Sequence, residues 1–255
     1  MSPAATAPAW WINCPGAATM AAGCPAPGNE SLVDAAALAR KVGGLRIRHA
    51  AGLIGLQEYG EIFGALMDTR TGACWCPEMD EATERYCGDV LQIFRKAQEK
   101  DPETVLMVEQ AVSLEPWAPG SAGACDALII SGGELETIAF RYGKGTALVA
   151  ARDPHIRLLA LGAAEAFRET YHLEKVRLTI MQPRISRSNT KLVELQKLLQ
   201  WGAETVRPAA AAVEAGRTDR KIFSCGPWCR WCPAKFSCRH RAEANLELTQ
   251  ISRKN

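Results

Sequence analysis

The sequence lacks the features of a membrane protein and of a secreted one. No apolar run reaches the roughly 18 residues that a membrane-spanning helix requires. The chain opens with Met-Ser-Pro rather than with a basic and apolar leader, and no internal repeat is visible. Ten cysteines would suit a disulfide framework in a small secreted domain, but 255 residues are too many for that class. We therefore expect a soluble protein of a reducing, cytoplasmic compartment, with no membrane contact.

The composition is that of an ordinary globular protein. Of the 255 residues, 47% are hydrophobic and 23% are charged, so the chain can bury a large core as one domain with appendages. The formal charge of +2 carries little information. The segment from Arg217 to Arg241, however, holds seven lysines and arginines against one acid, Asp219. That local excess suits a phosphate backbone and a solvated tail equally well.

The first part of the chain predicts an arm followed by helices. Residues 1–30 are rich in alanine, proline and glycine and form an arm that other parts of the chain must pin. An alanine-rich run predicts a helix over 31–48 with Ser31 as its N-cap. Apolar positions recur at helical spacing over 79–100, and the Asp-Pro that follows ends this helix. Residues 31–103 are therefore taken as one helical region.

The middle of the chain predicts a sheet. Apolar, β-branched segments between Pro-Gly and Gly-Gly turns indicate three consecutive strands, at 104–114, 125–131 and 134–142. Three further elements follow, a helix over 154–170, a strand over 176–182 and a long amphipathic helix over 190–213. This order predicts an α/β fold, with a mixed central sheet flanked by helices, for a core of residues 104–215. Residues 216–255 form a basic, cysteine-rich tail.

Cysteines give the strongest local signal. Near the C-terminus, Cys229, Cys232 and Cys238 are spaced Cys-x2-Cys-x5-Cys, and Cys14 stands in a lone Cys-Pro-Gly at the other end of the chain. Four thiolates of this kind can close around a metal centre and would then staple the two ends together. Cys225 offers a local alternative to Cys14, so iron–sulfur and zinc both stay open.

Charged side chains in the predicted strands are candidates for chemistry. Glu109 lies in the first strand and Asp126 begins the second. In the third strand, Ala139 and Arg141 share a face while Glu136 points away from them, because alternate residues of a strand face opposite sides. Charges in such strands are seldom fully buried unless they are paired. Two interpretations of Glu109 and Asp126 therefore remain open: they are exposed charges at a strand end or sheet edge, or they belong to a functional site.

Several of these motifs, taken together, resemble those of one nuclease family. The matching pieces are, in order, Cys14-Pro15-Gly16, Val108-Glu109-Gln110, Gly123-x-x-Asp126-Ala127, Tyr142-Gly143-Lys144-Gly145, Leu158 to Gly162, Gln182-Pro183-Arg184 and the final cysteine set. Their order and spacing, from about Trp10 to Leu248, look like the phage and prophage branch of the RecB-like nucleases of the PD-(D/E)XK superfamily. Any single piece would be a weak match.

The resemblance implies a DNA nuclease in which acidic side chains on a sheet hold Mg²⁺ and a lysine assists the attacking water. It also implies a [4Fe-4S] cluster bound by one N-terminal and three C-terminal cysteines. The residues that match this ligand set are Cys14, Cys229, Cys232 and Cys238. A local zinc site, in which Cys225 replaces Cys14, is the alternative.

The active-site motif of that family is eroded in this chain. Where members carry Asp-x-Lys, this sequence has Ala139-Phe140-Arg141, so a metal-binding acid and the lysine are both absent. His155 and Leu159 stand where the following helix of the family carries Gln-x-x-x-Tyr. The first helix also lacks the histidine that reaches the metal in relatives. Several independent losses in one site indicate that the site has stopped working.

Few residues remain that could hold a catalytic metal. Glu109 and Asp126 are the remnant ligands, and His155 is a candidate substitute. Arg141 keeps the positive charge of the missing lysine, but an arginine cannot act as a general base. Two carboxylates hold Mg²⁺ only weakly. We therefore expect little or no nuclease activity.

A fold that has lost catalysis can still hold DNA. Cations around the former active cleft would contact phosphates without any chemistry, and they are Arg141, Lys144, Arg152, Arg157 and Arg184. Plain surface charge is the other interpretation of these residues. In the tail, Trp228, Trp231 and Phe236 could stack on unpaired bases or pack around a metal knuckle.

The sequence thus predicts a pseudoenzyme of this nuclease type that binds DNA or a protein partner. That partner could be a phage recombination protein or a host nuclease or defence protein. One alternative is an active exonuclease that uses Glu109 and Asp126 with Mg²⁺ or Mn²⁺. A second alternative is a zinc-binding regulatory or structural protein.

Overall fold

The structure of the 255-residue chain is a computed structural model. It describes residues 8–21, 24, 30–68, 75–216, 219–230 and 232–252. Within these ranges, no helix combines the length and the apolar character that a membrane span needs. The chain divides into two compact units. Unit 1 comprises 1–27, 114–122 and 199–255, and unit 2 comprises 28–113 and 123–198.

Unit 2 holds the sheet and most of the helices. Its elements in chain order are α3 (Glu30–Ala50), α4 (Leu56–Asp68), α5 (Pro77–Gln98), β1 (Val105–Ser113), β2 (Ala122–Ser131), β3 (Glu134–Phe140), η1 (Ala150–Arg152), α6 (Pro154–Phe167), β4 (Lys175–Gln182), η2 (Pro183–Ile185), β5 (Arg187–Glu194) and the start of α7 (Leu195–Trp201). The strand order is β1-β2-β3-β4-β5. Strand β3 runs parallel to β4, whereas β2 and β3, and β4 and β5, are antiparallel. The predicted α/β fold with a mixed sheet and flanking helices is confirmed.

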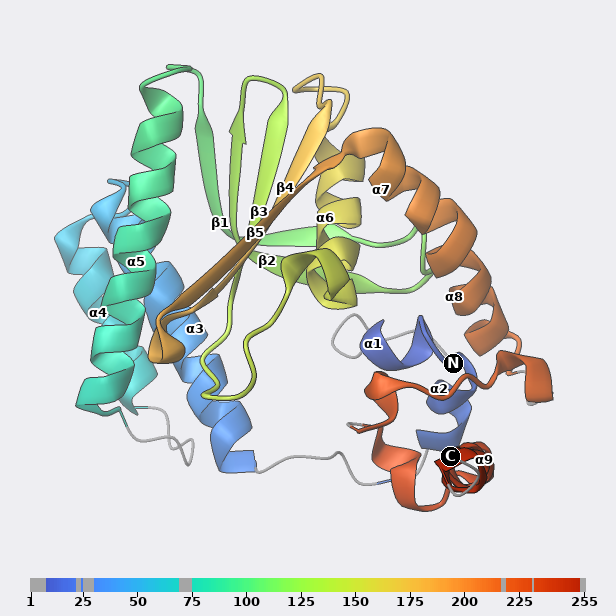
Figure 1. The fold of residues 1–255 in the computed structure, drawn as a ribbon. Helices are drawn as coiled ribbons and strands as arrows, with labels where there is room; N and C mark the ends of the chain where they lie inside the picture. The colour runs from blue at the N-terminus through green and yellow to red at the C-terminus, as the bar shows by residue number, and fades with distance from the viewer. Residues whose placement is uncertain are drawn as a thin grey trace. The chain divides into compact units, whose positions relative to one another are not determined.

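Helices cover both faces of this sheet (Figure 1). Helices α3 and α5 pack on one face, where Ile138 and Phe140 join one buried cluster. The ring of Tyr86 from α5 lies 4.7 Å from that of Phe140, centroid to centroid. Gly43 allows α3 to approach α5, since a Cβ at this position would lie 2.9 Å from the Tyr86 ring. Apolar burial at this helix–sheet interface supplies the main driving force for folding.

Helix α6 lies on the other side of the sheet, with eight buried residues along its length. Asp153 is its N-cap, and Oδ1 of Asp153 accepts hydrogen bonds from the backbone N–H groups of His155 (2.8 Å) and Ile156 (3.1 Å). Pro154 occupies the first helical turn, where its missing N–H costs nothing. These local signals fix the start of α6 and therefore the position of His155.

Two local predictions are wrong. Helix α3 begins at Glu30, so Ser31 lies in its first turn and is not the N-cap. The helix predicted over 190–213 begins only at Leu195, because the preceding residues pair with β4 as strand β5. The turn at η2 ends at Ser186, whose φ of 49° reverses the chain into a hairpin. Pairing with β4 therefore outweighs the helical periodicity of the sequence over residues 190–194, which adjoin helix α7.

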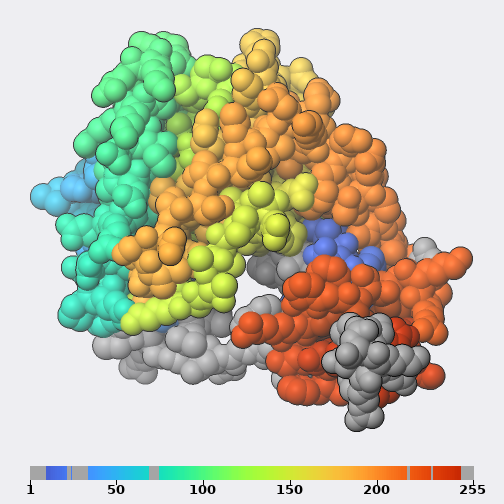
Figure 2. Space-filling model, viewed as in Figure 1, coloured from blue at the N-terminus to red at the C-terminus, as the bar shows by residue number. Residues whose placement is uncertain are grey.

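Unit 1 brings together segments from both ends of the chain. Its elements are α1 (Pro8–Trp11), α2 (Gly16–Ala21), the π-helical segment η3 (Gly202–Val206), α8 (Arg207–Glu214), η4 (Arg220–Ile222), η5 (Pro227–Arg230), η6 (Pro233–Phe236) and α9 (Arg239–Ser252). A small apolar cluster joins Cys14 and Ala17 of the arm to Cys232 and Ala234 of the tail. Figure 2 shows the N-terminal residues against the C-terminal segments. The tail thus pins the described part of the arm.

Gly16 is required at the contact between arm and tail. A Cβ on Gly16 would lie 2.4 Å from the ring of Phe223. That ring is held in turn by a stacked contact with His240, at 4.0 Å between centroids. The ring therefore cannot move aside without breaking a second contact.

We expect Gly16→Ala to lower the free energy of unfolding of unit 1 by about 1–3 kcal/mol, the usual cost of overpacking. Denaturant unfolding followed by tryptophan fluorescence measures it. Gly88→Ala in α5 is the matched control, because nothing lies within 4 Å of a Cβ there. The control should be neutral or slightly stabilised. Equal stability of Gly16→Ala and the parent would contradict the close packing.

Candidate functional site

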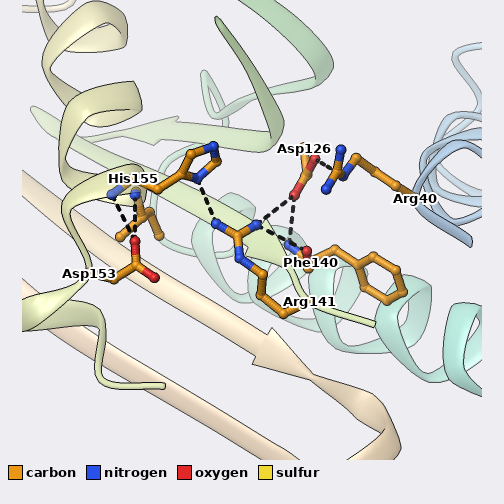
Figure 3. A network of polar contacts seen from close by, with 7 residues as sticks. Arg40, Asp126, Phe140, Arg141, Asp153 and His155 are labelled. Atoms are coloured by element: carbon orange, nitrogen blue, oxygen red, sulfur yellow. Dashed lines mark hydrogen bonds and ion pairs between the residues drawn. The ribbon is translucent and has the colours of Figure 1, made fainter. Parts of the chain in front are cut away.

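Asp126 lies in the middle of β2, not at its start as the sequence predicted, and is the centre of a polar network in unit 2 (Figure 3). Its side chain is only 10% exposed. Oδ1 of Asp126 lies 3.2 Å from Nε of Arg40, and Oδ2 accepts a hydrogen bond of 2.8 Å from the backbone N–H of Phe140. Oδ2 also lies 4.0 Å from Nη1 of Arg141. Both oxygens of this carboxylate are therefore engaged by positive or hydrogen-bonding groups.

Arg141 connects Asp126 to helix α6. Its Nη2 donates to Nδ1 of His155 at 2.6 Å, and its Nη1 donates to the carbonyl of Phe140 at 3.2 Å. Burial, followed by the nearby positive charge of Arg141, lowers the pKa of His155 to about 4. His155 is therefore neutral at pH 7, with Nδ1 as acceptor and the proton on Nε2. The nitrogen facing Arg141 is not available as a metal ligand.

The charge balance of the network opposes metal binding. Burial raises the pKa of Asp126, while Arg40 and Arg141 act in the opposite direction. A buried carboxylate of this kind is stable when cations compensate it. Two guanidinium groups already do so here, and they would repel a divalent cation that approached the same oxygens.

Glu109 lies in β1 with an unusual backbone. Its φ of 54° is in the left-handed region, which costs a residue with a side chain about 1–2 kcal/mol. Its side chain is 36% exposed, and Oε2 of Glu109 lies 3.7 Å from Nη2 of Arg48. Gly44 leaves room for it, since a Cβ there would lie 3.2 Å from Cγ of Glu109. Such strain is often retained at functional sites.

The arginines of helix α3 were not among the residues singled out from the sequence. Arg40 and Arg48 pair with Asp126 and Glu109, the two acids that the sequence marked as remnant metal ligands. Nothing in an alanine-rich helical pattern distinguishes an arginine that reaches a buried acid from one that faces solvent. Within the described ranges, no three histidine, cysteine, aspartate or glutamate side chains are grouped so as to hold a metal ion.

Glu136 takes no part in this network. Its side chain is buried beside α5, where Oε1 accepts a hydrogen bond from the hydroxyl of Thr179 at 2.5 Å. Nε of Arg177 lies 3.9 Å from its Oε2. Alternation along β3 places Ala139 on the opposite face, and Ala139 is buried and has no ligand atom.

Most cations predicted to contact DNA are already paired or partly buried. Lys144 and Arg184 both bind Glu78, at 2.5 Å and 2.7 Å. The hydrogen bond from Arg184 and then that from Lys144 lower the pKa of Glu78 to about 2. Burial lowers the pKa of Arg157, whereas Arg152 lies exposed on the surface.

The cysteines predicted to bind a metal all lie in unit 1, but among the described residues their side chains are not grouped closely enough to hold a metal ion as they stand. One cavity is lined by five of them, Cys14, Cys225, Cys229, Cys232 and Cys238. The Sγ of Cys14 accepts a hydrogen bond of 3.4 Å from the backbone N–H of Ser224. Burial raises the pKa of the Cys14 thiol and, to about 11, that of the Cys225 thiol, with neighbouring cysteine charges adding to the effect. The thiols thus repel one another as thiolates unless a cation joins them.

Comparison with known proteins places the chain in a family. Residues 3–255 match the family described as "Protein of unknown function (DUF2800)". The chain belongs to the DUF2800 family. Among solved structures, one described as "Crystal structure of SSO0001" is similar over 62% of this chain and 71% of that one. The two chains share 15% identity, with a TM-score of 0.30.

We expect the neutral His155 of this DUF2800 protein to make its stability depend on pH. The folded protein binds fewer protons than the unfolded chain between about pH 4 and pH 6.5, so stability rises with pH across this window. His155→Gln removes the titrating group and can keep an acceptor for Arg141. Its unfolding free energy should therefore lack this increase, which amounts to at most about 3 kcal/mol.

Urea unfolding of both proteins at pH 4.5, 5.5 and 7 measures the difference. His172→Gln is the control for removal of a histidine outside the network. If the His155→Gln curve runs parallel to that of the parent, then His155 is not held neutral.

Proposed function

We propose that the protein is a homologue of the RecB-like, PD-(D/E)XK nucleases that binds DNA or a protein of a nuclease pathway and has lost catalysis. One observation carries this proposal. Both oxygens of Asp126 are engaged by Arg40, Arg141 and a backbone N–H. Two guanidinium groups already compensate the charge of this carboxylate, and they oppose the approach of a catalytic metal to the same oxygens.

If arginines take the place of a metal, the fold around Asp126 is preserved although the site does not catalyse hydrolysis. Mg²⁺ requires octahedral oxygen ligands and binds through carboxylates that face open space. The guanidinium of Arg40 instead supplies fixed positive charge on the same carboxylate. An arginine cannot act as a general base, so Arg141 cannot activate a water molecule as the lysine of the nuclease family would. The two arginines thus stabilise the fold around Asp126 but do not support metal-dependent hydrolysis.

The two alternatives from the sequence make different demands on these residues. An active exonuclease using Glu109 and Asp126 would require Arg40 and Arg48 to withdraw when Mg²⁺ or Mn²⁺ binds. Arg48 could do so at little cost, because its pair with Glu109 is long and partly exposed. Arg40 would have to leave a buried carboxylate, which costs considerably more. The pairing of Arg40 with Asp126 therefore favours a site without nuclease activity over an active exonuclease.

The cysteine cavity supports a metal centre as part of the same proposal. Cys14, Cys229, Cys232 and Cys238 would hold a [4Fe-4S] cluster, which supplies a rigid covalent bridge between arm and tail. Zinc held by Cys225 and the three C-terminal cysteines is the alternative, and would fit a regulatory or structural protein. Cys14 is buried in the same cavity, whereas Cys225 is exposed, and this favours the set that contains Cys14.

Pairing with Glu78 does not prevent Lys144 and Arg184 from binding DNA. The side chains of Glu78 and Lys144 are 44% and 58% exposed, and an exposed pair of this kind contributes little to stability, whereas the Arg184 side chain is mostly buried. A DNA phosphate carries the same charge and can take the place of Glu78. Arg152 is exposed on the surface of the same unit. These cations support a DNA contact that requires no metal.

We expect the parent protein to cleave neither linear duplex nor single-stranded DNA with Mg²⁺ or Mn²⁺. The triple variant Arg40→Ala, Ala139→Asp, Arg141→Lys removes one positive charge, adds a carboxylate and restores a lysine. It should bind Mn²⁺ at least roughly tenfold more tightly than the parent, as measured by loss of the free Mn²⁺ signal in electron paramagnetic resonance.

Adding Asp126→Ala to the triple variant is the control and should abolish that Mn²⁺ binding. Cleavage by the parent that disappears in its Asp126→Ala variant would instead establish the active exonuclease. A parent that binds Mn²⁺ as tightly as the triple variant would show that the arginines do not block the site.

The metal assignment predicts a brown protein when it is purified without oxygen, with absorbance near roughly 400 nm. Cys14→Ser should lose most of the iron, because it removes one of four thiolates. Cys225→Ser is the matched control from the same cavity and should keep it. Iron and zinc analysis measures both. The reverse pattern, with zinc lost from Cys225→Ser and no iron in the parent, would establish the local zinc site.

A further inference from the structure

Phe236 is the most exposed large apolar side chain among the described residues, at 90%. It ends η6 in the cysteine-rich tail of unit 1, between Cys232 and Cys238 in the sequence. A fully exposed aromatic ring is unfavourable in water unless something covers it. The two cysteines that flank Phe236 in the sequence, Cys232 and Cys238, both line the cysteine cavity.

Beside this ring lies an open groove with a volume of about 760 Å³. Its lining includes three cations, Arg230, Lys235 and Arg241, together with Phe236 itself. Among the described residues that line it, Glu247 is the one acid. The groove therefore combines an exposed aromatic surface with an excess of positive charge.

The cations are held close to the ring by backbone contacts. Nζ of Lys235 lies 5.0 Å from the centre of the Phe236 ring and donates to the carbonyl of Arg230 at 3.3 Å. Nη1 of Arg241 donates to the carbonyl of Lys235 at 2.7 Å. In the described part of the tail, Glu243 pairs with Arg220 and Arg239, and the ion pairs include neither Lys235 nor Arg241. Their charge remains available to an anionic partner.

Single-stranded nucleic acid matches this combination of groups. Its bases present free aromatic faces that stack on side chains, and its backbone carries one negative charge per nucleotide. Duplex DNA offers the charge, but its bases are stacked on one another and cannot reach an exposed ring. An acidic protein would match the cations and would leave the ring without a specific partner.

We propose that Phe236, Lys235 and Arg241 form a contact surface for single-stranded DNA on the cysteine-rich unit. This inference rests on the DNA-binding part of the proposed function and gives it a location and a strand preference. A base stacks on Phe236, and the adjoining phosphates lie against the two cations. The surface requires no metal at Asp126 and no cleavage.

Fluorescence anisotropy with labelled oligo-dT, oligo-U and a DNA duplex tests this proposal on the full chain. Phe236→Ala should weaken oligo-dT binding roughly 5- to 150-fold, the range expected for one lost stacking contact, while Phe236→Tyr should retain it. Lys235→Gln and Arg241→Gln should each reduce the steepness of the salt dependence, which Phe236→Ala should leave unchanged. The control is Leu56→Ala, which removes another exposed apolar side chain from unit 2.

The possible failures can be told apart. Unchanged binding by Phe236→Ala, with loss in Lys144→Gln and Arg184→Gln, would overturn this surface and leave DNA binding to unit 2. A parent that binds none of the three probes would overturn the DNA-binding function as well. Tighter binding to the duplex than to oligo-dT would exclude the stacking contact, and tighter binding to oligo-U would identify RNA as the ligand. Equal metal content in parent and variants rules out misfolding of the tail.

Discussion

A carboxylate removed from water needs compensating charge, and unit 2 is organised around this requirement at Asp126. The compensation comes from Arg40 on α3, from Arg141 after β3, and from the backbone N–H of Phe140. Arg141 extends the network to His155 at the start of α6 (Figure 3). One buried charge thereby links the helices on both faces of the sheet. Guanidinium groups from α3 and from the residue after β3 hold these elements together.

Unit 1 depends on a different constraint, the closure of a small apolar cavity by segments from the two ends of the chain. Ser224 and Cys14 are in hydrogen-bond contact although 210 positions separate them in the sequence. Gly16 and Phe223 fit together at the same contact. A chain closure of this length has a large entropic cost. A metal bound by thiolates from both segments would offset that cost, which is the physical reason to expect one in the cysteine cavity.

Much of the secondary structure could be predicted, because strand alternation, helical periodicity and turn residues act locally. The strands β1 to β4 and the helices α5 and α6 appear close to their predicted ranges. The sequence predicts helix for residues 190–194 of β5, because these residues adjoin a true helix, and only pairing with β4 makes them a strand. Arg40 was missed for a related reason. A surface arginine and one that reaches a buried acid look the same in a sequence.

The sequence by itself determined which chemical groups are present: Ala139-Phe140-Arg141, the acids Glu109 and Asp126, and cysteines near both ends of the chain. Those are statements about residue identity, and no folding changes them. The tertiary structure decided what these groups contact. It placed Arg40 and Arg141 on Asp126, gathered five cysteines in one cavity, and left Phe236 exposed beside cations. Such contacts join residues far apart in the chain, and a local pattern does not encode which distant side chain arrives.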